Sequence, residues 1–193
     1  MTHQIKIPLH TLDEAKVQEL KEKYPGAELN VVLYPEGGAS TMSDDEFWEI
    51  IEQLDWEQPE DDAILAPAVK ALAERSVRQI YDFANALSHR LFQLDQYELA
   101  RHIGVDAWRK DRYFSVDNFL YVRACVIANG RRFFEQVLQE PSAMPEDISF
   151  EALLYLPQLA YEAKTGEKYD YVPAFPIETY SNIKGWKSVK TST

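Results

Sequence analysis

The residues best suited to chemistry are carboxylates, which gather in one short stretch of the 193-residue chain. Between residues 43 and 62, ten of twenty side chains are Asp or Glu and none is Lys or Arg. Paired carboxylates can act as general acid and base or hold a magnesium ion. Asp45, Glu49 and Glu52 fall on successive turns of one expected helical face, and Asp55 follows them. Because such sites usually gather acids from several elements into a concave pocket, a solvated helix face is the simpler interpretation.

The other chemistry-bearing residue types form no recognisable catalytic motif. The four histidines do not show the HExxH spacing or any other close metal-ligand spacing. The single cysteine, Cys125, lies on the apolar side of an expected helix, which predicts a buried thiol rather than a nucleophile. The G-x-S-x-G elbow and the glycine-rich phosphate loops are absent. The sequence therefore predicts no metal and no cofactor, and it favours a protein without enzymatic activity.

Charge is distributed unevenly along the chain. The formal net charge is −12, yet residues 43–62 alone contribute −10, which leaves 22 acids against 20 bases elsewhere. Residues 101–134 are locally basic, with three Asp against seven bases: Arg101, Arg109, Lys110, Arg112, Arg123, Arg131 and Arg132. The acidic stretch could lie against this basic region, mediate self-association as a homodimer, or bind a basic partner protein. Internal pairing requires the fewest assumptions.

Composition limits the classes of partner and the compartment. A sequence pI near 4.8 argues against a general affinity for nucleic acid or for an anionic membrane. Binding of nucleic acid would need the bases of residues 101–134 to converge on one face. No apolar run approaches the roughly 20 residues that span a bilayer, and the first residues do not resemble a signal peptide. We therefore expect a cytoplasmic protein without a membrane partner.

From residue 43 onward the pattern is helical. Ser43, Ser76 and Ser115 are expected N-caps, each followed by apolar residues at helical spacing. A last long helix is predicted from residue 149 to a stop at Gly166, with Pro157 bending it in the middle. Beyond this helix the chain is rich in Tyr, Pro and Trp, which predicts an extended segment packed over the helices.

The first 36 residues give a different pattern. Residues 5–9 and 29–34 are expected to be strands, because β-formers or alternating apolar residues dominate them. A helix capped by Thr11 is expected between them, and residues 35–41 read as a linker. The predicted fold class is thus mainly α: a multi-helix orthogonal bundle over residues 43–193, with a small βαβ-like unit at residues 1–36.

Three segments of the chain together resemble a known bacterial family. They are DDEFWEIIEQL, SVDNFLYVRACVIANGRRFFEQVL and LLYLPQLAYEAKTG, which contain an FW-x-x-I helix, an S-x-D-x-F-x-x-x-R helix and an AYE-x-x-TG helix. In this order they resemble the bacterial domain of unknown function family 4240 over roughly residues 43–166. One position departs from the family pattern, since Val122 stands where an aromatic residue is usual before Arg123. The resemblance implies a mostly helical fold and no known activity.

Physical reasoning about the shared residues leaves two functional hypotheses. The first is a regulatory, immunity-like interaction protein that binds a basic partner through Asp45, Glu49, Glu52 and Asp55. The second is a small-molecule-binding protein or enzyme with an anion-binding pocket near Asp117, Arg123 and Arg131. Since Arg123 interrupts an apolar face, it is expected to need carboxylate or carbonyl partners, and a structural ion pair is the alternative to ligand binding.

Overall fold

The computed structural model describes residues 13–26 and 42–187. The chain divides into two units, Met1–Glu36 and Gly37–Thr193, and each is described by itself. In the first unit the described residues form one helix, α1 (Glu14–Lys23), which has no buried residue. Asp13 is its N-cap, and the carboxylate accepts a hydrogen bond from the backbone N–H of Lys16 at 2.8 Å.

The prediction of a βαβ-like unit at residues 1–36 is wrong. Every regular element within residues 13–26 and 42–187 is a helix, so the described fold is all-α rather than α with a strand-containing appendage. The two segments expected to be strands, 5–9 and 29–34, and the expected cap Thr11 lie outside the described residues. The physical weakness of the prediction is that two strands alone do not make a stable sheet.

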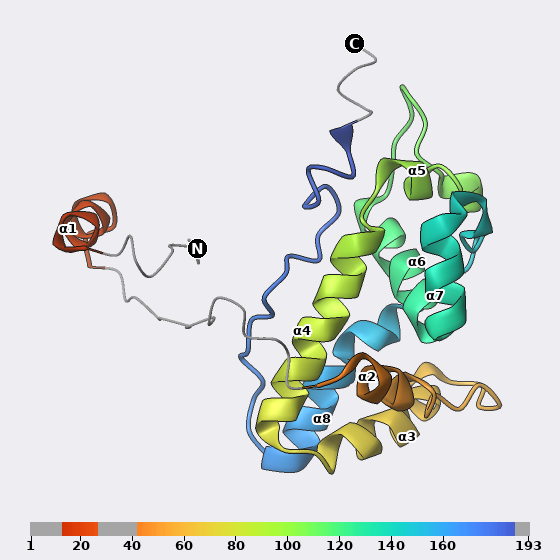
Figure 1. Ribbon diagram of the computed structural model, residues 1–193, viewed down its shortest axis with the longest axis horizontal. Helices are drawn as coiled ribbons and strands as arrows, with labels where there is room; N and C mark the ends of the chain where they lie inside the picture. Colours follow the sequence, from red (N-terminus) through yellow and green to blue (C-terminus); the bar gives the residue numbers. More distant parts are fainter. Residues whose placement is uncertain (1–12, 27–41, 188–193) are drawn as a thin grey trace. The chain divides into compact units, whose positions relative to one another are not determined.

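The second unit consists of α-helices and short 3-10 helices joined by brief loops (Figure 1). In chain order they are α2 (Asp44–Ile51), α3 (Asp61–Ala73), α4 (Val77–Leu94), α5 (Tyr97–Ala100), η2 (Gly104–Asp106), α6 (Val116–Ala128), α7 (Arg131–Gln139), η3 (Pro141–Ala143), η4 (Glu151–Tyr155) and α8 (Leu156–Thr165).

The predicted helix starts in this unit are confirmed by their caps. The Oγ atoms of Ser43, Ser76 and Ser115 accept hydrogen bonds from the backbone N–H three residues on, at 3.1, 3.3 and 3.2 Å. At Ser43 and Ser76 the reciprocal bond from the side chain of the third helical residue completes a capping box. Such a cap typically contributes about 1 kcal/mol, so the sequence specifies these boundaries locally.

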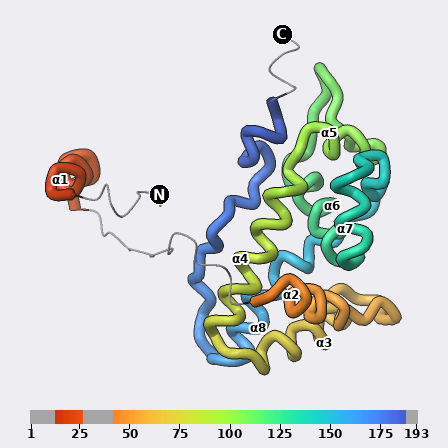
Figure 2. The backbone as a smooth tube through the Cα atoms, viewed as in Figure 1, coloured from red at the N-terminus to blue at the C-terminus, as the bar shows by residue number. Residues whose placement is uncertain are grey.

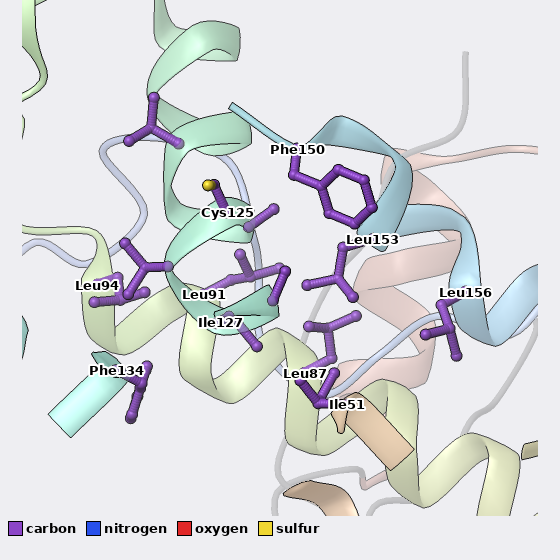
Figure 3. Packing of buried hydrophobic residues seen from close by; sticks show 14 of the residues in the cluster. Ile51, Leu87, Leu91, Leu94, Cys125, Ile127, Phe134, Phe150, Leu153 and Leu156 are labelled. Carbon is purple, nitrogen blue, oxygen red and sulfur yellow. The ribbon is translucent and has the colours of Figure 1, made fainter. Parts of the chain in front are cut away.

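The core is built around α4, which contacts α3, α6 and α8. Figure 3 shows apolar side chains from different helices meeting there, including Leu91 of α4, Ile127 of α6 and Leu153 of η4. All three are at most 1% exposed. Since each fully buried side chain of this size contributes roughly 1.5–3 kcal/mol, this cluster is the main stabilising feature of the domain.

The last helix differs from the expectation. Instead of one bent helix, the chain forms the 3-10 helix η4 and then α8, with Pro157 in the first turn of α8. Proline lacks the N–H that would be left unpaired in a first turn, so it begins a helix more easily than it bends one. The predicted stop is confirmed, because Gly166 takes the left-handed conformation with φ of 72°.

Residues 167–187 form an extended tail that lies along α4 (Figure 2), as the aromatic composition predicts. Near its start, the ring of Tyr171 stacks on Tyr81 of α4 with 4.1 Å between centroids. Asn85 of α4 donates a hydrogen bond to the Tyr171 hydroxyl and accepts one from the backbone N–H of Ala174, both at 2.8 Å. The tail is therefore bonded to the domain and not merely adjacent to it.

Candidate functional site

The first turn of the acidic helix α2 is occupied by internal ion pairs. Asp44 lies within ion-pairing distance of both Arg90 and Arg131, and it accepts a hydrogen bond from the indole N–H of Trp48 at 3.2 Å. Asp45 accepts a hydrogen bond from Nη1 of Arg131 at 2.7 Å. We call Asp44, Asp45, Arg90 and Arg131 the outer cluster. It corresponds to the internal pairing that the charge distribution allowed.

Arg90 is the most enclosed member of the outer cluster. Its guanidinium lies over the ring of Phe47, 3.8 Å from the centroid, and donates to the backbone carbonyl of Ala86 at 3.0 Å. Burial lowers the pKa of Arg90, and the charge of Asp44 opposes this effect. Arg131 is half exposed, and its hydrogen bond to Glu135 raises its pKa. Both arginines remain cations that neutralise the start of α2.

The remaining acids of the predicted face do not share one environment. Glu49 and Glu52 are exposed, and neither carboxylate is ion-paired within residues 13–26 and 42–187. Asp55 is half-buried, and it accepts hydrogen bonds from the backbone N–H of Glu57 at 3.2 Å and from the side chain of Gln58 at 2.9 Å. Asp55 therefore shapes the loop between α2 and α3, whereas Glu49 and Glu52 face solvent.

Arg123 is fully buried, and its partners come mainly from the backbone. Nη1 donates to the carbonyl of Leu91 at 2.8 Å, and Nη2 donates to the carbonyl of Ile177 at 3.0 Å and to Oγ1 of Thr179 at 3.1 Å. Its Nε has no hydrogen-bond partner in the described part of the chain. Burial lowers the pKa of Arg123 to about 10, while the charges of Asp95 and Glu178 act in the opposite direction.

Asp95, directly after α4, is the acidic counterpart of Arg123. Its side chain is fully buried and accepts three hydrogen bonds from the tail: from the backbone N–H of Tyr180 at 3.2 Å, from that of Asn182 at 2.8 Å and from the indole N–H of Trp186 at 2.8 Å. We call Asp95 and Arg123 the inner cluster. Both side chains form hydrogen bonds with the tail, whose donors and acceptors replace those that water would otherwise supply.

The predicted anion-binding residues are not brought together. Arg123 is sealed by the tail, Arg131 is bound to acids of α2, and Asp117 is exposed in the first turn of α6. The structure instead brings together Arg131 and Asp45, which the sequence hypotheses had assigned to different sites. Of the seven bases in residues 101–134, Arg101 also has an acidic partner, Glu98, at 3.3 Å. Arg101, Arg123 and Arg131 thus have partners within the fold, and the side chains of four further bases of the region are exposed: Arg109, Lys110, Arg112 and Arg132.

A pocket of about 330 Å³ lies between α6, α7 and the segment before η4. Its lining residues are Trp56, Cys125, Asn129, Phe133, Pro145, Ile148, Ser149 and Phe150. Cys125 is buried, and burial raises the pKa of its thiol, so the thiol stays protonated as the sequence predicts. None of the predicted binding residues lines this pocket, although Trp56 directly follows Asp55.

Three structurally important residues were missed by the sequence reasoning: Arg90, Asp95 and Trp186. Arg90 lies three residues after Leu87 and four before Leu94, so the helical spacing itself places it on the apolar face of α4. Asp95 directly follows that face. For Trp186 the only signal was the aromatic composition of the tail, which does not identify a hydrogen-bond acceptor.

No three His, Cys, Asp or Glu side chains of residues 13–26 and 42–187 stand together as they would around a metal ion. No helix in the same ranges is long and apolar enough to cross a membrane.

These features define an all-α protein whose described helical domain is covered along α4 by an anchored C-terminal tail. The chain belongs to the family described as "Protein of unknown function (DUF4240)", whose sequence profile matches residues 42–163. This confirms the family resemblance, and the tail lies beyond the matched range. No curated protein and no solved structure matches the chain.

Proposed function

We propose that this protein is a non-enzymatic interaction module that binds a basic partner protein through the acidic surface at the end of α2 and in the loop to α3. We call this surface the acidic face; its members are Glu49, Glu52, Glu57, Glu60, Asp61 and Asp62, all of them exposed. The proposal refines the sequence hypothesis, because Asp45 and Asp55 have partners within the fold and leave the set.

The observation that carries the proposal is that, within residues 13–26 and 42–187, no base forms an ion pair with the acidic face. Residues 43–69 contain ten acids and no Lys, Arg or His, and the bases that approach them bind the first turn of α2. Asp61 and Asp62 lie in the first turn of α3, where their negative charges interact favourably with the helix dipole. Glu49 and Glu52 have no comparable local role. A surface of one sign raises association rates with oppositely charged partners, so a basic protein is the partner that this face suits.

The test is capture of partners from an extract by wild type and by two matched double variants. Glu49→Lys with Glu52→Lys reverses the acidic face, and Glu74→Lys with Glu167→Lys makes the same charge change at exposed positions outside it. The first variant should lose a partner that wild type and the second variant retain, and thermal unfolding of the variants should remain close to wild type. If the two variants capture the same proteins as wild type, the proposal is wrong.

Capture should also depend on salt. An interaction made by exposed charges weakens as the Debye length shrinks from about 10 Å at 0.1 M to 3 Å at 1 M salt. A partner that remains bound to wild type at high salt, with undiminished affinity, would contradict binding through the acidic face.

A further inference from the structure

The pocket beside the acidic face has apolar residues at its rim that are exposed to solvent. Trp56 is 50% exposed and Ile148 is 61% exposed, although both are large apolar residues. Deeper in the pocket, Cys125 and Phe150 are buried, and Figure 3 shows both among the residues of the apolar cluster. The ring of Trp56 packs against that of Phe150 at 5.1 Å between centroids. The pocket therefore has an apolar base and an exposed apolar rim.

The size of the pocket suits an aromatic or large aliphatic side chain. Its volume is about 330 Å³. An apolar cavity of about 150 Å³ in a protein is already large enough to bind benzene. Two polar side chains, Asn129 and Ser149, complete a lining that is otherwise mostly apolar. Such a combination is typical of sites that bind an apolar group and fix its orientation with few polar contacts.

The charge around the pocket indicates which charge the ligand should carry beside its apolar group. Six of the eight lining residues come from residues 43–69 and 133–163. These two ranges together contain sixteen Asp or Glu and no Lys, Arg or His. Acids directly flank the lining residues in the chain: Glu57 follows Trp56, and Glu146 and Asp147 precede Ile148. The basic neighbour in the sequence is Arg132, which precedes Phe133. A ligand that enters here meets predominantly negative charge.

We infer that this pocket binds one aromatic side chain from a lysine- or arginine-rich segment of the partner protein. The inference rests on the proposed function, because it takes the acidic face as the surface that attracts the partner. Charge on the partner pairs with the acidic face, and the aromatic ring displaces water from Trp56 and Ile148. Aromatic anchors buried in a pocket often provide much of the affinity of an interface, while complementary charges speed association and add specificity.

The test uses two synthetic peptides as probes: a lysine-rich peptide with one central phenylalanine, and the same peptide with alanine at that position. Their dissociation constants are measured by calorimetry at one low salt concentration. Wild type should bind the phenylalanine peptide about tenfold more tightly or better, since the pocket removes the apolar ring from water. The preference requires no variant, so it can be measured even if a variant fails to fold.

Variants then locate the preference. Trp56→Ser and Ile148→Ser should reduce it toward equal binding of the two peptides, whereas Ile183→Ser, at a similarly exposed isoleucine in the tail, should leave it unchanged. Glu49→Lys with Glu52→Lys should weaken the binding of both peptides by a similar factor. Circular dichroism confirms that each variant retains its helices.

The outcomes separate the two proposals. Equal affinity of both peptides for wild type, with weaker binding after Glu49→Lys and Glu52→Lys, overturns the pocket inference and leaves the acidic face intact. A tenfold preference that Trp56→Ser and Ile148→Ser do not reduce also overturns it. Binding of neither peptide overturns it as well, and the capture experiment then decides the proposed function separately. Concentration-dependent dimerisation that Ile148→Ser abolishes would identify a second copy of the chain as the occupant instead.

Discussion

The inner cluster and the outer cluster contain the same kinds of charge but differ in their contact with water. Asp95 and Arg123 are both 0% exposed, whereas the side chains of Asp45 and Arg131 are 81% and 46% exposed. The inner charges are satisfied by the tail and the outer ones by each other and by solvent. An ion pair open to water contributes little, while a buried charge that loses its partners is costly. Residues of the same type therefore contribute very differently to the stability of this domain.

The largest expected effect comes from removing the inner carboxylate. Asp95→Ala leaves three donors of the tail unpaired and removes the stronger of the two negative charges that act on Arg123. We therefore expect a loss of about 3–5 kcal/mol in the free energy of unfolding. Urea denaturation measures the change. The matched control is Asp45→Ala in the outer cluster, which should cost less than about 1 kcal/mol. Equal losses in the two variants would remove the distinction between the clusters.

Arg90 should give an effect between those extremes. It belongs to the outer cluster, yet its side chain is only 9% exposed and lies over Phe47. Arg90→Met keeps much of the packing but removes the bond to Asp44 and the cation–π contact, so we expect a loss of about 2 kcal/mol. Arg131→Met, measured in the same denaturation series, should lose less. If Arg131→Met were the more damaging change, burial would not be what ranks these arginines.

High pH should weaken the aromatic contacts at the other end of the tail. Burial raises the pKa of Tyr81 to about 12, and burial also raises the pKa of Tyr169. In the unfolded chain tyrosine ionises near pH 10, so the stability from Tyr81 is fully present below about pH 10 and is lost as pH rises toward 12. Arg123 has the opposite effect on the free energy of unfolding. Because its pKa in the folded state is lowered to about 10, the folded state releases this proton first, and the contribution of Arg123 to stability rises with pH in this range.

The contribution of Tyr81 is separated from that of Arg123 by comparison with Tyr81→Phe. The free energy of unfolding of this variant should fall less steeply than that of wild type between about pH 9 and pH 11. A variant with the wild-type slope would show that Tyr81 does not cause the alkaline loss.

The smallest expected effect concerns salt. A double-mutant cycle between Asp45 and Arg131 should give a coupling energy below about 1 kcal/mol, which shrinks further when salt is raised to about 1 M. The loss caused by Asp95→Ala should change little over the same range, because buried charges are poorly screened. Salt sensitivity at Asp95 comparable to that of the Asp45–Arg131 pair would indicate that water reaches the inner cluster.

What the sequence predicted well depends on neighbours along the chain. The helix starts at Ser43, Ser76 and Ser115 and the stop at Gly166 are set by residues within one turn, so they can be found without knowing the fold. The burial of Cys125 followed from helical periodicity alone. The prediction of a strand-containing appendage is wrong. A composition rich in β-formers does not by itself make a sheet, because two strands need further strands or a helix to pack against.

What could not be predicted depends on residues far apart. The expectation that Arg123 needs carboxylate or carbonyl partners was sound, but its carbonyl partners include Ile177, which follows 54 positions later in a segment without periodicity. The different environments of Arg123, Arg131 and Asp117 could not be predicted for the same reason, since nearness in sequence says nothing about which side of α6 the tail covers. The pocket shares this property, because α6 and Trp56 meet only in three dimensions.

The anchoring of the tail also has a consequence for the order of events during synthesis. The tail groups that bind Asp95 and Arg123 lie between 54 and 91 positions further along the chain. A growing chain that has emerged only as far as α8 already contains both charges and most of the apolar core. It lacks every tail partner of Asp95, and Arg123 then keeps only its bond to the carbonyl of Leu91. Closure of the domain is thus expected to wait until residues 177–186 have been synthesised. A ribosome-bound chain halted before residue 177 should remain accessible to proteases around Arg123.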